Sequence, residues 1–469
     1  MSRYSMTIGG EAVTTASTLP VVNPALGKPF EESPSCSREQ LDAAMDAAQK
    51  AFGSWRRDEA VRRQALLACS EALKARANEI GELLTREQGK PLEAAIGEVF
   101  GSAIWFEATS ALPIPSELIS DTEEERVELR RKPLGVVGAI TPWNFPIILA
   151  VWKIAPALLA GNTMVLKPSP FTPLSTLLVG EVLRSALPPG VLNVVAGGDE
   201  LGAWISSHPV PRKLSFTGSI ATGKKIMAAA APDLKRVTLE LGGNDPAIVL
   251  KDVDPATVGP KLFKSAFENS GQLCIAIKRV YVEEEIYAPL VESIAEAASR
   301  AVVGDGLQPG TELGPINNQP QYERVLGIID SARKDGATFV TGGEAIPGDG
   351  YFIQPTIATD ISDGSRLVDE EQFGPVLPII PVRSVEDALE RANSTHFGLG
   401  GSVWTSNRER GVELAGELEC GTAWVNRHAA LGPMAPFGGF KWSGIGRENG
   451  TWGLEAFTEL QVINIEKGD

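Results

Sequence analysis

The 469-residue chain contains few cysteines and histidines, and this scarcity limits the chemistry it can carry. The four cysteines lie too far apart for a disulfide framework or for the paired spacing of a zinc site. The three histidines are equally scattered, which excludes the usual zinc signatures. We therefore expect no metal and a reduced, cytoplasmic setting. These residues are Cys36, Cys69, Cys274, Cys420, His208, His396 and His428.

Basic charge and long apolar runs are also lacking. The formal net charge of −16 disfavours nucleic acid or an anionic membrane as a partner, because both require a basic surface. The most apolar region, residues 134–162, is interrupted by three prolines and by Lys153, so it does not supply the ~20 apolar residues of a membrane span. The N-terminal segment lacks the basic start and apolar core of a signal peptide. A small molecule is the expected partner.

The chain does have a regular alternation of apolar patterns. Residues 37–52 and 59–84 show helical periodicity, and the first segment opens with Ser37 and Gln40 in capping-box spacing. From residue 134, the short apolar runs "LGVVGAI", "NTMVLKP", "VLNVVAG", "RKLSFTG" and "RVTLELGG" alternate with helical segments. Continuous apolar runs are typical of parallel strands buried on both faces, so they predict a Rossmann-type β-α-β unit. A second α/β run follows Gly243 and extends to about residue 440.

Four short stretches carry side chains suited to catalysis. "FTGSIATG" joins a predicted strand to a predicted helix, where backbone N–H groups can bind an anion. Glu240 ends a strand, at the edge of the sheet that lines the ligand crevice, and Asn144 can donate its amide to an oxyanion. Taken singly, each has an ordinary alternative: a glycine-rich turn, a solvated carboxylate, a capping asparagine, and for Cys274 an inert buried thiol. The stretches are "TPWNFP" (141–146), "FTGSIATG" (216–223), "LELGGNDP" (239–246) and "FENSGQLCIAIKR" (267–279).

Taken together, these stretches closely resemble the aldehyde dehydrogenase superfamily, in the order that family shows. Further matching pieces are "MVLKPSPFTP", "EEQFGPVLP", "CGTAWVN" and "APFGGFKWSGIGRE", so the resemblance covers nearly the whole chain. It implies an α/β fold with a Rossmann-type cofactor domain, an α/β catalytic domain and a β oligomerisation arm. The implied boundaries are 1–115 and 134–242 for the cofactor domain, 243–442 for the catalytic domain, and 116–133 and 443–469 for segments that bridge a homodimer or homotetramer.

The resemblance also implies a reaction and a role for each matching residue. The reaction is NAD(P)⁺-dependent oxidation of an aldehyde to the carboxylic acid through a cysteine thiohemiacetal and thioester. Cys274 is the implied nucleophile, Asn144 the oxyanion donor and Glu240 the general base. The implied cofactor residues are Trp143, Lys167, Ser169, Gly218, Ser219, Gly242, Glu371 and Phe373. The implied substrate pocket comprises Leu149, Trp152, Glu268, Ile275, Arg427, His428, Leu431 and Phe437.

Two departures from the family pattern leave specificity open. Many NAD-preferring relatives carry a glutamate where this chain has Pro170, so the cofactor is NAD or NADP, with NAD favoured as the family default. Many relatives carry an aromatic or apolar residue immediately before Asn269, where this chain has Glu268. We expect a mainly apolar tunnel for aliphatic or aromatic aldehydes. At its mouth, Glu268 and Arg427 either pair with each other or are solvated.

Several alternatives to this function remain. Acyl transfer to coenzyme A does not need the water-activating base that Glu240 supplies, so that alternative is disfavoured. A semialdehyde dehydrogenase of the same superfamily is an alternative in substrate only. A cofactor-independent Cys-Glu-Lys hydrolase of the amidase or nitrilase type leaves the β-α-β unit and Lys167 unexplained. A non-catalytic relative is opposed by the presence of all three catalytic residue types.

Overall fold

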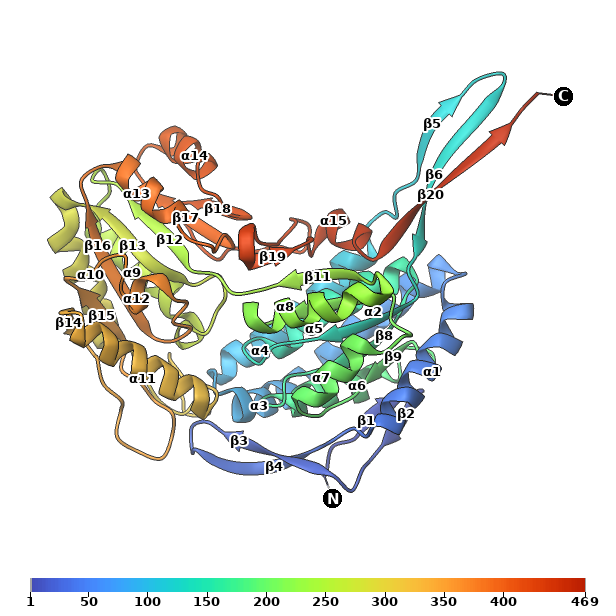
Figure 1. Cartoon of the computed structure of the whole chain (residues 1–469). Coiled ribbons are helices and arrows are strands. Elements are labelled where there is room, and N and C mark those ends of the chain that lie inside the picture. The colour runs from blue at the N-terminus through green and yellow to red at the C-terminus, as the bar shows by residue number, and fades with distance from the viewer. Residues whose placement is uncertain (1, 469) are drawn as a thin grey trace.

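The computed structural model describes residues 2–468 and contains two open sheets with a projecting arm (Figure 1). The first sheet has eight strands, of which the central five are parallel, and the three outer strands join it through antiparallel pairings. This confirms the β-α-β fold that the apolar runs predict. In order across the sheet, the strands are β19 (Gly444–Ile445), β11 (Arg236–Glu240), β10 (Lys213–Thr217), β7 (Val136–Ile140), β8 (Thr163–Lys167), β9 (Leu192–Val194), β1 (Met6–Ile8) and β2 (Glu11–Val13).

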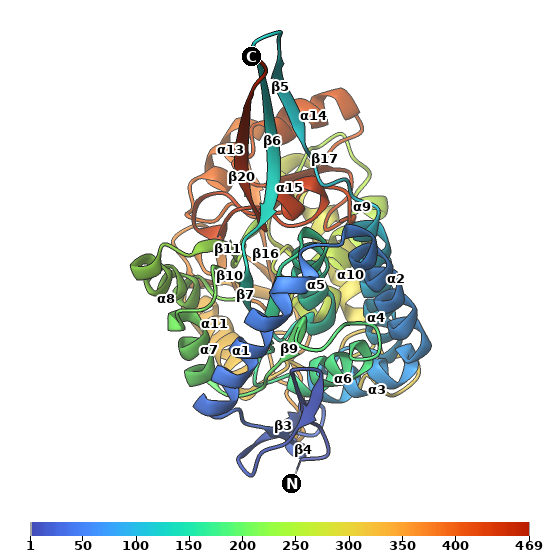
Figure 2. The same ribbon diagram turned by 90° about the vertical axis from the view of Figure 1, so that its right-hand side faces the viewer.

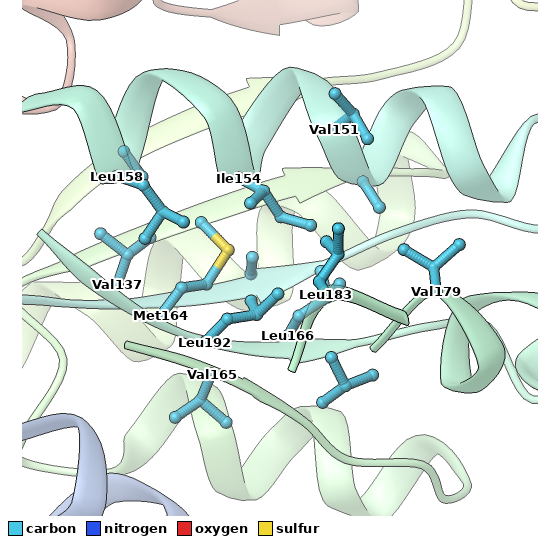
Figure 3. Packing of buried hydrophobic residues seen from close by; sticks show 14 of the residues in the cluster. Val137, Val151, Ile154, Leu158, Met164, Val165, Leu166, Val179, Leu183 and Leu192 are labelled. Carbon is cyan, nitrogen blue, oxygen red and sulfur yellow. The ribbon is translucent and has the colours of Figure 1, made fainter. Parts of the chain in front are cut away.

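Helices cover this sheet and bury its apolar side chains. Ile154 and Leu158 on α5 lie over Met164 on β8, as Figure 3 shows. Every residue of β8 is buried, which explains why the strand appears in the sequence as an uninterrupted apolar run. The helices of this part are α1 (Arg38–Trp55), α2 (Glu59–Ala75), α3 (Ala77–Gln88), α4 (Leu92–Ser110), α5 (Pro146–Ala160), α6 (Pro173–Leu183), α7 (Asp199–Ser207), α8 (Ile220–Ala230) and η1 (Ala231–Asp233).

The two helices expected near the N-terminus differ in how well the sequence predicts them. At the start of α1, Ser37 and Gln40 form the predicted capping box. The single helix expected over residues 59–84 is instead two helices, α2 and α3. They separate at Arg76, whose φ of −118° and ψ of 19° are not helical. The Arg76 side chain binds Glu79 in the first turn of α3 and Glu181 on α6, so one local and one tertiary contact stabilise the break.

The second sheet has seven strands and is also mainly parallel. Its only antiparallel pairing joins β14 to β15. The strands are β14 (Thr338–Thr341), β15 (Thr356–Thr359), β16 (Val376–Val382), β13 (Ile277–Glu283), β12 (Asp245–Val249), β17 (Gly400–Trp404) and β18 (Thr422–Val425). The helices around it are α9 (Pro255–Phe267), η2 (Glu268–Gly271), η3 (Glu284–Ile286), α10 (Tyr287–Arg300), α11 (Gln319–Lys334), α12 (Arg366–Asp369), α13 (Val385–Asn393) and α14 (Arg408–Gly416).

A three-stranded arm projects from the first sheet and carries the C-terminal strand (Figures 1 and 2). β20 (Thr458–Glu466) pairs antiparallel with β6 (Glu125–Pro133), and β5 (Glu117–Asp121) pairs with the other edge of β6. The tail strand thus has a partner within its own chain and still presents one open edge. The remaining elements are the hairpin of β3 (Thr18–Asn23) and β4 (Lys28–Pro34), η4 (Lys441–Ser443) and α15 (Gly450–Glu455). Within residues 2–468, every helix is too short or too polar to cross a membrane.

Both sheets converge on the segment that links them. β11 ends at Glu240, and β12 begins at Asp245, so residues 241–244 carry the chain from the first sheet to the second. Parallel strands place their carboxyl ends at one edge, where ligands bind in open α/β sheets. The ends of β7, β10 and β11 therefore face the catalytic stretches of the second sheet.

Candidate active site

The loop that carries Cys274 has an unusual backbone held by one buried glutamine. Residues 269–271, just before it, have φ values of 50, 58 and 73°. Left-handed backbone is costly for non-glycine residues and persists only where the surroundings enforce it. The Gln272 amide donates to the carbonyls of Asn269 (2.9 Å) and Pro315 (3.1 Å), and its Oε1 accepts from the backbone N–H of Asn317 (2.8 Å). These three hydrogen bonds fix the loop and hence the position of the thiol.

The Cys274 thiol is half-buried and unpaired by any disulfide. Burial raises the pKa of Cys274 to about 12, and the nearby Lys278 ammonium opposes that rise. Lys278 Nζ donates to the Cys274 carbonyl (2.7 Å) and lies 3.6 Å from Glu371 Oε1. Without further positive charge, the cysteine is therefore held as the protonated thiol.

Asn144 lies on the turn after β7, directly beside the cysteine loop. Its Nδ2 donates to the Gln272 carbonyl (3.0 Å), which leaves a second N–H for another acceptor. The backbone carbonyl of Asn144 accepts from Lys90 Nζ (2.9 Å), and Lys90 forms a buried ion pair with Glu98 (2.5 Å). Glu98 Oε1 also accepts from the backbone N–H of Ile147 (2.9 Å) at the start of α5. The amide is thus oriented by a network that joins α4, α5 and the cysteine loop.

Glu240 ends β11 as a buried carboxylate without a hydrogen-bond partner in the described part of the chain. It is 3% exposed, and neither of its oxygens is bonded. Burial raises its pKa well above the ordinary value, the nearby Glu448 adds to the rise, and Lys153 opposes it. Lys153 Nζ in turn binds Glu448 Oε1 (2.6 Å) and Thr217 Oγ1 (2.8 Å). An unbonded carboxylate with a raised pKa is suited to accept a proton from water.

Two cavities meet at Cys274. One has a volume of about 370 Å³ and the other about 160 Å³. Five residues line both of them, so they form the junction. Glu240 and Glu448 line only the smaller cavity. The shared residues are Asn144, Leu149, Thr217, Leu241 and Cys274.

The larger cavity contains most of the residues expected to bind the cofactor. Trp143 and Phe373 meet edge to face in its wall, with ring centroids 5.3 Å apart. Ser219 caps α8, accepting from the Thr222 N–H (3.2 Å), at the helix end where N–H groups favour an anion. Glu371 needs the space that Gly242 leaves, because a Cβ at residue 242 would lie 2.1 Å from Glu371 Oε2. The expected residues that line this cavity are Trp143, Gly218, Ser219, Gly242, Glu371 and Phe373.

Lys167 and Ser169 do not line the larger cavity. Both are buried at the end of β8, and Lys167 Nζ donates to the Pro168 carbonyl (3.1 Å). Burial lowers the pKa of Lys167 to about 8, and the Asp199 carboxylate partly opposes this. The expected cofactor residues therefore form two groups: six line the larger cavity, and Lys167 and Ser169 lie at the end of β8.

The smaller cavity contains six of the eight expected pocket residues. Trp105, which the sequence did not predict as a pocket residue, stacks on Trp152 at 5.8 Å, and Phe437 meets Trp152 at 5.5 Å. Arg427 and His428 lie outside the lining. Arg427 is exposed, whereas His428 is buried behind the cavity with Nε2 2.7 Å from the Ile275 carbonyl. The six are Leu149, Trp152, Glu268, Ile275, Leu431 and Phe437.

Comparison with known proteins agrees with this geometry. The model of the aldehyde dehydrogenase family matches residues 12–463. Human (Homo sapiens) retinaldehyde dehydrogenase 3 is 42% identical over 462 residues, which cover 95% of this chain and 89% of that protein. The chain belongs to the aldehyde dehydrogenase family. Phenylacetaldehyde dehydrogenase of Pseudomonas fluorescens is a further relative, 40% identical over 98% of this chain and 96% of its own length.

Solved structures of the family have the same architecture as this aldehyde dehydrogenase. The NAD⁺ complex of aldehyde dehydrogenase from Bacillus cereus superposes with a TM-score of 0.97 at 36% identity, covering 99% of this chain and 96% of that one. The chain is accordingly an NAD(P)⁺-dependent enzyme that oxidises aldehydes.

Among the residues of this aldehyde dehydrogenase site that the sequence did not predict, four illustrate why. Lys278 lies within the cysteine stretch itself, four positions after the thiol. Lys153 is the one charge inside an apolar helix, and a lone charge in such a place needs a buried partner. That partner, Glu448, ends the matching piece "APFGGFKWSGIGRE". For Trp105, which lies far away in the sequence on α4, no local pattern indicates a pocket.

Proposed function

We propose that this aldehyde dehydrogenase oxidises aliphatic or aromatic aldehydes to carboxylic acids, with Cys274 as the nucleophile. The observation that carries the proposal is the position of Cys274 at the junction of the two cavities. An aldehyde in the smaller cavity can be attacked by sulfur while its carbonyl carbon faces the larger one. Attack forms a thiohemiacetal, and its oxidation leaves a thioester on Cys274.

Asn144 and Glu240 supply the two polar functions that this chemistry needs. The free N–H of the Asn144 amide stabilises the oxyanion formed on attack. Glu240 lines the same cavity and accepts a proton from the water that hydrolyses the thioester. Because the buried Glu240 can activate water, hydrolysis of the thioester is favoured over acyl transfer to coenzyme A.

NAD(P)⁺ fits the larger cavity, and when bound it supplies the acceptor for the hydride that leaves the aldehyde. The backbone at Gly218 and Ser219, at the α8 N-terminus, would hold the pyrophosphate. Arg324 Nη1 is buried there without a partner within residues 2–468, which also favours an anionic ligand. Glu371 would hold one ribose, and Trp143 and Phe373 would enclose the nicotinamide.

Lys167 and Ser169 are proposed to hold the second ribose. We infer a preference for NAD⁺ with measurable use of NADP⁺, because Pro170 carries no charge that repels a 2′-phosphate. Turnover with each cofactor at equal concentration tests this preference, and a complete lack of NADP⁺ turnover contradicts it.

The test of the reaction uses Glu240→Gln. The amide keeps the shape of the side chain and removes the base, so we expect steady-state turnover to fall about 10²- to 10³-fold. Because Glu240 is assigned to hydrolysis of the thioester, the first turnover should remain faster than the later ones. Stopped-flow absorbance of the reduced cofactor measures that burst, and mass spectrometry detects the acyl group on Cys274.

The control for this test is Glu417→Gln, which removes an exposed carboxylate outside both cavities. It should keep wild-type turnover. Unchanged steady-state turnover in Glu240→Gln contradicts the assigned base. An acyl-coenzyme A product in place of the acid contradicts hydrolysis.

We further propose a homodimer or homotetramer in a cytoplasmic setting. The first sheet would form the cofactor domain, the second the catalytic domain, and the arm the bridge between subunits. The arm exposes apolar side chains and an open strand edge, which require cover in water. These side chains are Leu118, Ile119, Leu460, Val462 and Ile465. All four cysteines are free, which suits a reducing compartment.

A further inference from the structure

The smaller cavity has acidic side chains in its lining and no basic one among the residues that the structure describes. Glu240, Glu268 and Glu448 line it, and no lysine, arginine or histidine does. Lys153 neutralises Glu448 from behind, through Oε1, while Glu448 Oε2 and both Glu240 oxygens have no hydrogen-bond partner within residues 2–468. A carboxylate on the substrate would therefore meet no basic side chain in this lining, whereas a cation would meet carboxylates. The ammonium groups of Lys90 and Lys153 lie behind the wall and are paired with Glu98 and Glu448.

Glu268 is the one acidic lining residue that is exposed, and it stands at the end of α9. Its backbone N–H donates to the Lys264 carbonyl, which fixes its place at the helix end. No ion pair to Glu268 exists in the described part of the chain, and Arg427, the partner considered from the sequence, is exposed and unpaired with it. Burial lowers the pKa of the Lys90 ammonium, the Glu98 and Glu268 carboxylates oppose this, and Lys90 is already paired with Glu98. Of the two alternatives, pairing or solvation, the structure has the solvated carboxylate. Its charge is thus available to a ligand.

The walls between Glu268 and the catalytic residues are aromatic. Trp152 stacks on Trp105, with ring centroids 5.8 Å apart, and meets Phe437 edge to face, with centroids 5.5 Å apart. Aromatic faces attract ammonium groups and accept apolar groups equally well, but they offer nothing to an anion. Phe145 in the same lining already has the Lys90 ammonium 3.6 Å from its ring centroid.

We propose that Glu268 determines specificity and that the site prefers aldehydes whose far end carries a positive charge, an ammonium or quaternary ammonium group. The aldehyde carbon lies at Cys274, the connecting chain lies against the tryptophans, and the cation lies near Glu268. This inference rests on the proposed function, since it assumes oxidation at Cys274. It extends the apolar tunnel expected from the sequence: among aldehydes of equal shape, the cation is oxidised most efficiently and the anion least.

The test compares three aldehydes of similar length and different charge. They are 3-(trimethylammonio)propanal, its neutral carbon isostere 4,4-dimethylpentanal, and the anion 4-oxobutanoate. We expect kcat/KM with the cation to exceed that with the isostere by about fivefold, the size of a favourable exposed charge pair. The anion should fall below the isostere by a similar factor. Both ratios should shrink as ionic strength rises, because salt screens exposed charges.

Variants assign the effect to Glu268. Glu268→Gln should bring the cation-to-isostere ratio close to 1, and Glu268→Lys should invert it. Glu292→Gln is the matched control, since it removes one exposed carboxylate on α10 outside the cavity. It should leave the ratio at its wild-type value, which shows that net charge alone is not the cause.

The outcomes separate this inference from the proposed function. A wild-type ratio near 1, or a ratio that Glu268→Gln leaves unchanged, overturns the role of Glu268 while oxidation of the neutral isostere still stands. Faster oxidation of the anion than of the cation overturns it too. Failure of the wild-type enzyme with neutral aldehydes contradicts the proposed function instead. The wild-type ratios and their salt dependence decide the matter even if a variant folds poorly.

Discussion

The two cavities that meet at Cys274 differ in the kind of residues that line them. The larger one is lined by residues at strand ends, by a helix N-terminus and by charged side chains. The smaller one is a box of aromatic side chains with carboxylates and no basic residue in the described lining. In the proposed function, this difference lets one enzyme combine a cofactor that does not vary with an aldehyde that can vary. The backbone largely sets the shape of the larger cavity. The shape of the smaller cavity depends on aromatic side chains, which single substitutions can change.

The largest expected effect comes from removing the thiol at which the two cavities join. Cys274→Ala should lower aldehyde oxidation by about 10⁴-fold or more, because no other group at the junction can form the thioester. Steady-state production of reduced cofactor measures this. Cys420→Ala, at a thiol outside both cavities, is the control and should keep most of the activity. Comparable turnover in the two variants would falsify the assignment of Cys274.

The second effect is the pH dependence of the same thiol in the cofactor-free enzyme. Burial raises the pKa of Cys274 to about 12, so at lower pH the thiolate fraction falls about tenfold per pH unit. Alkylation by iodoacetamide should therefore accelerate about 100-fold between pH 7 and pH 9. Peptide mass spectrometry follows the label at residue 274. A rate that is flat over this range means that the thiolate is already formed without the cofactor.

The smallest of the three effects tests whether the larger and the smaller cavity act independently of each other. Glu371 accepts a hydrogen bond from the Gly243 N–H (3.1 Å) and lies on the cofactor side only. Glu371→Gln should raise the KM for NAD⁺ by about tenfold, the loss expected when a charged hydrogen bond becomes neutral. The KM for the aldehyde should stay within about twofold. Equal changes in both constants show that the two cavities are coupled.

The contrast between the cavities also explains which residues could be predicted from the sequence. Cys274, Glu240, Asn144 and Gly218 lie on short stretches next to strands, where the local sequence pattern predicts a shared site, and all four line the two cavities. The aromatic box has no such signal. Trp105 reaches it from α4, whereas Phe437 comes from a loop more than 300 residues later.

Charged residues inside the core were the other limit of sequence reasoning. Lys153 and Glu448 form a buried pair across a separation of 295 residues. Only the fold shows that such a pair lies beside Glu240, the proposed base. Arg427 and His428 were expected in the pocket because they follow "WVN". The backbone at Asn426 has a φ of 55°, and after that turn His428 lies behind Ile275 while Arg427 is exposed.

The pairing of β6 with β20 has a consequence for how the chain is made. Thr458, which pairs with Pro133, is synthesised 325 residues after it. At roughly 5–20 residues per second, β6 waits on the order of a quarter of a minute to a minute for its partner. During that time the strand has one edge open beside exposed apolar residues, which invites pairing between nascent chains. Loss of β20 would make this waiting state permanent, so this one strand decides whether the edge of β6 is covered.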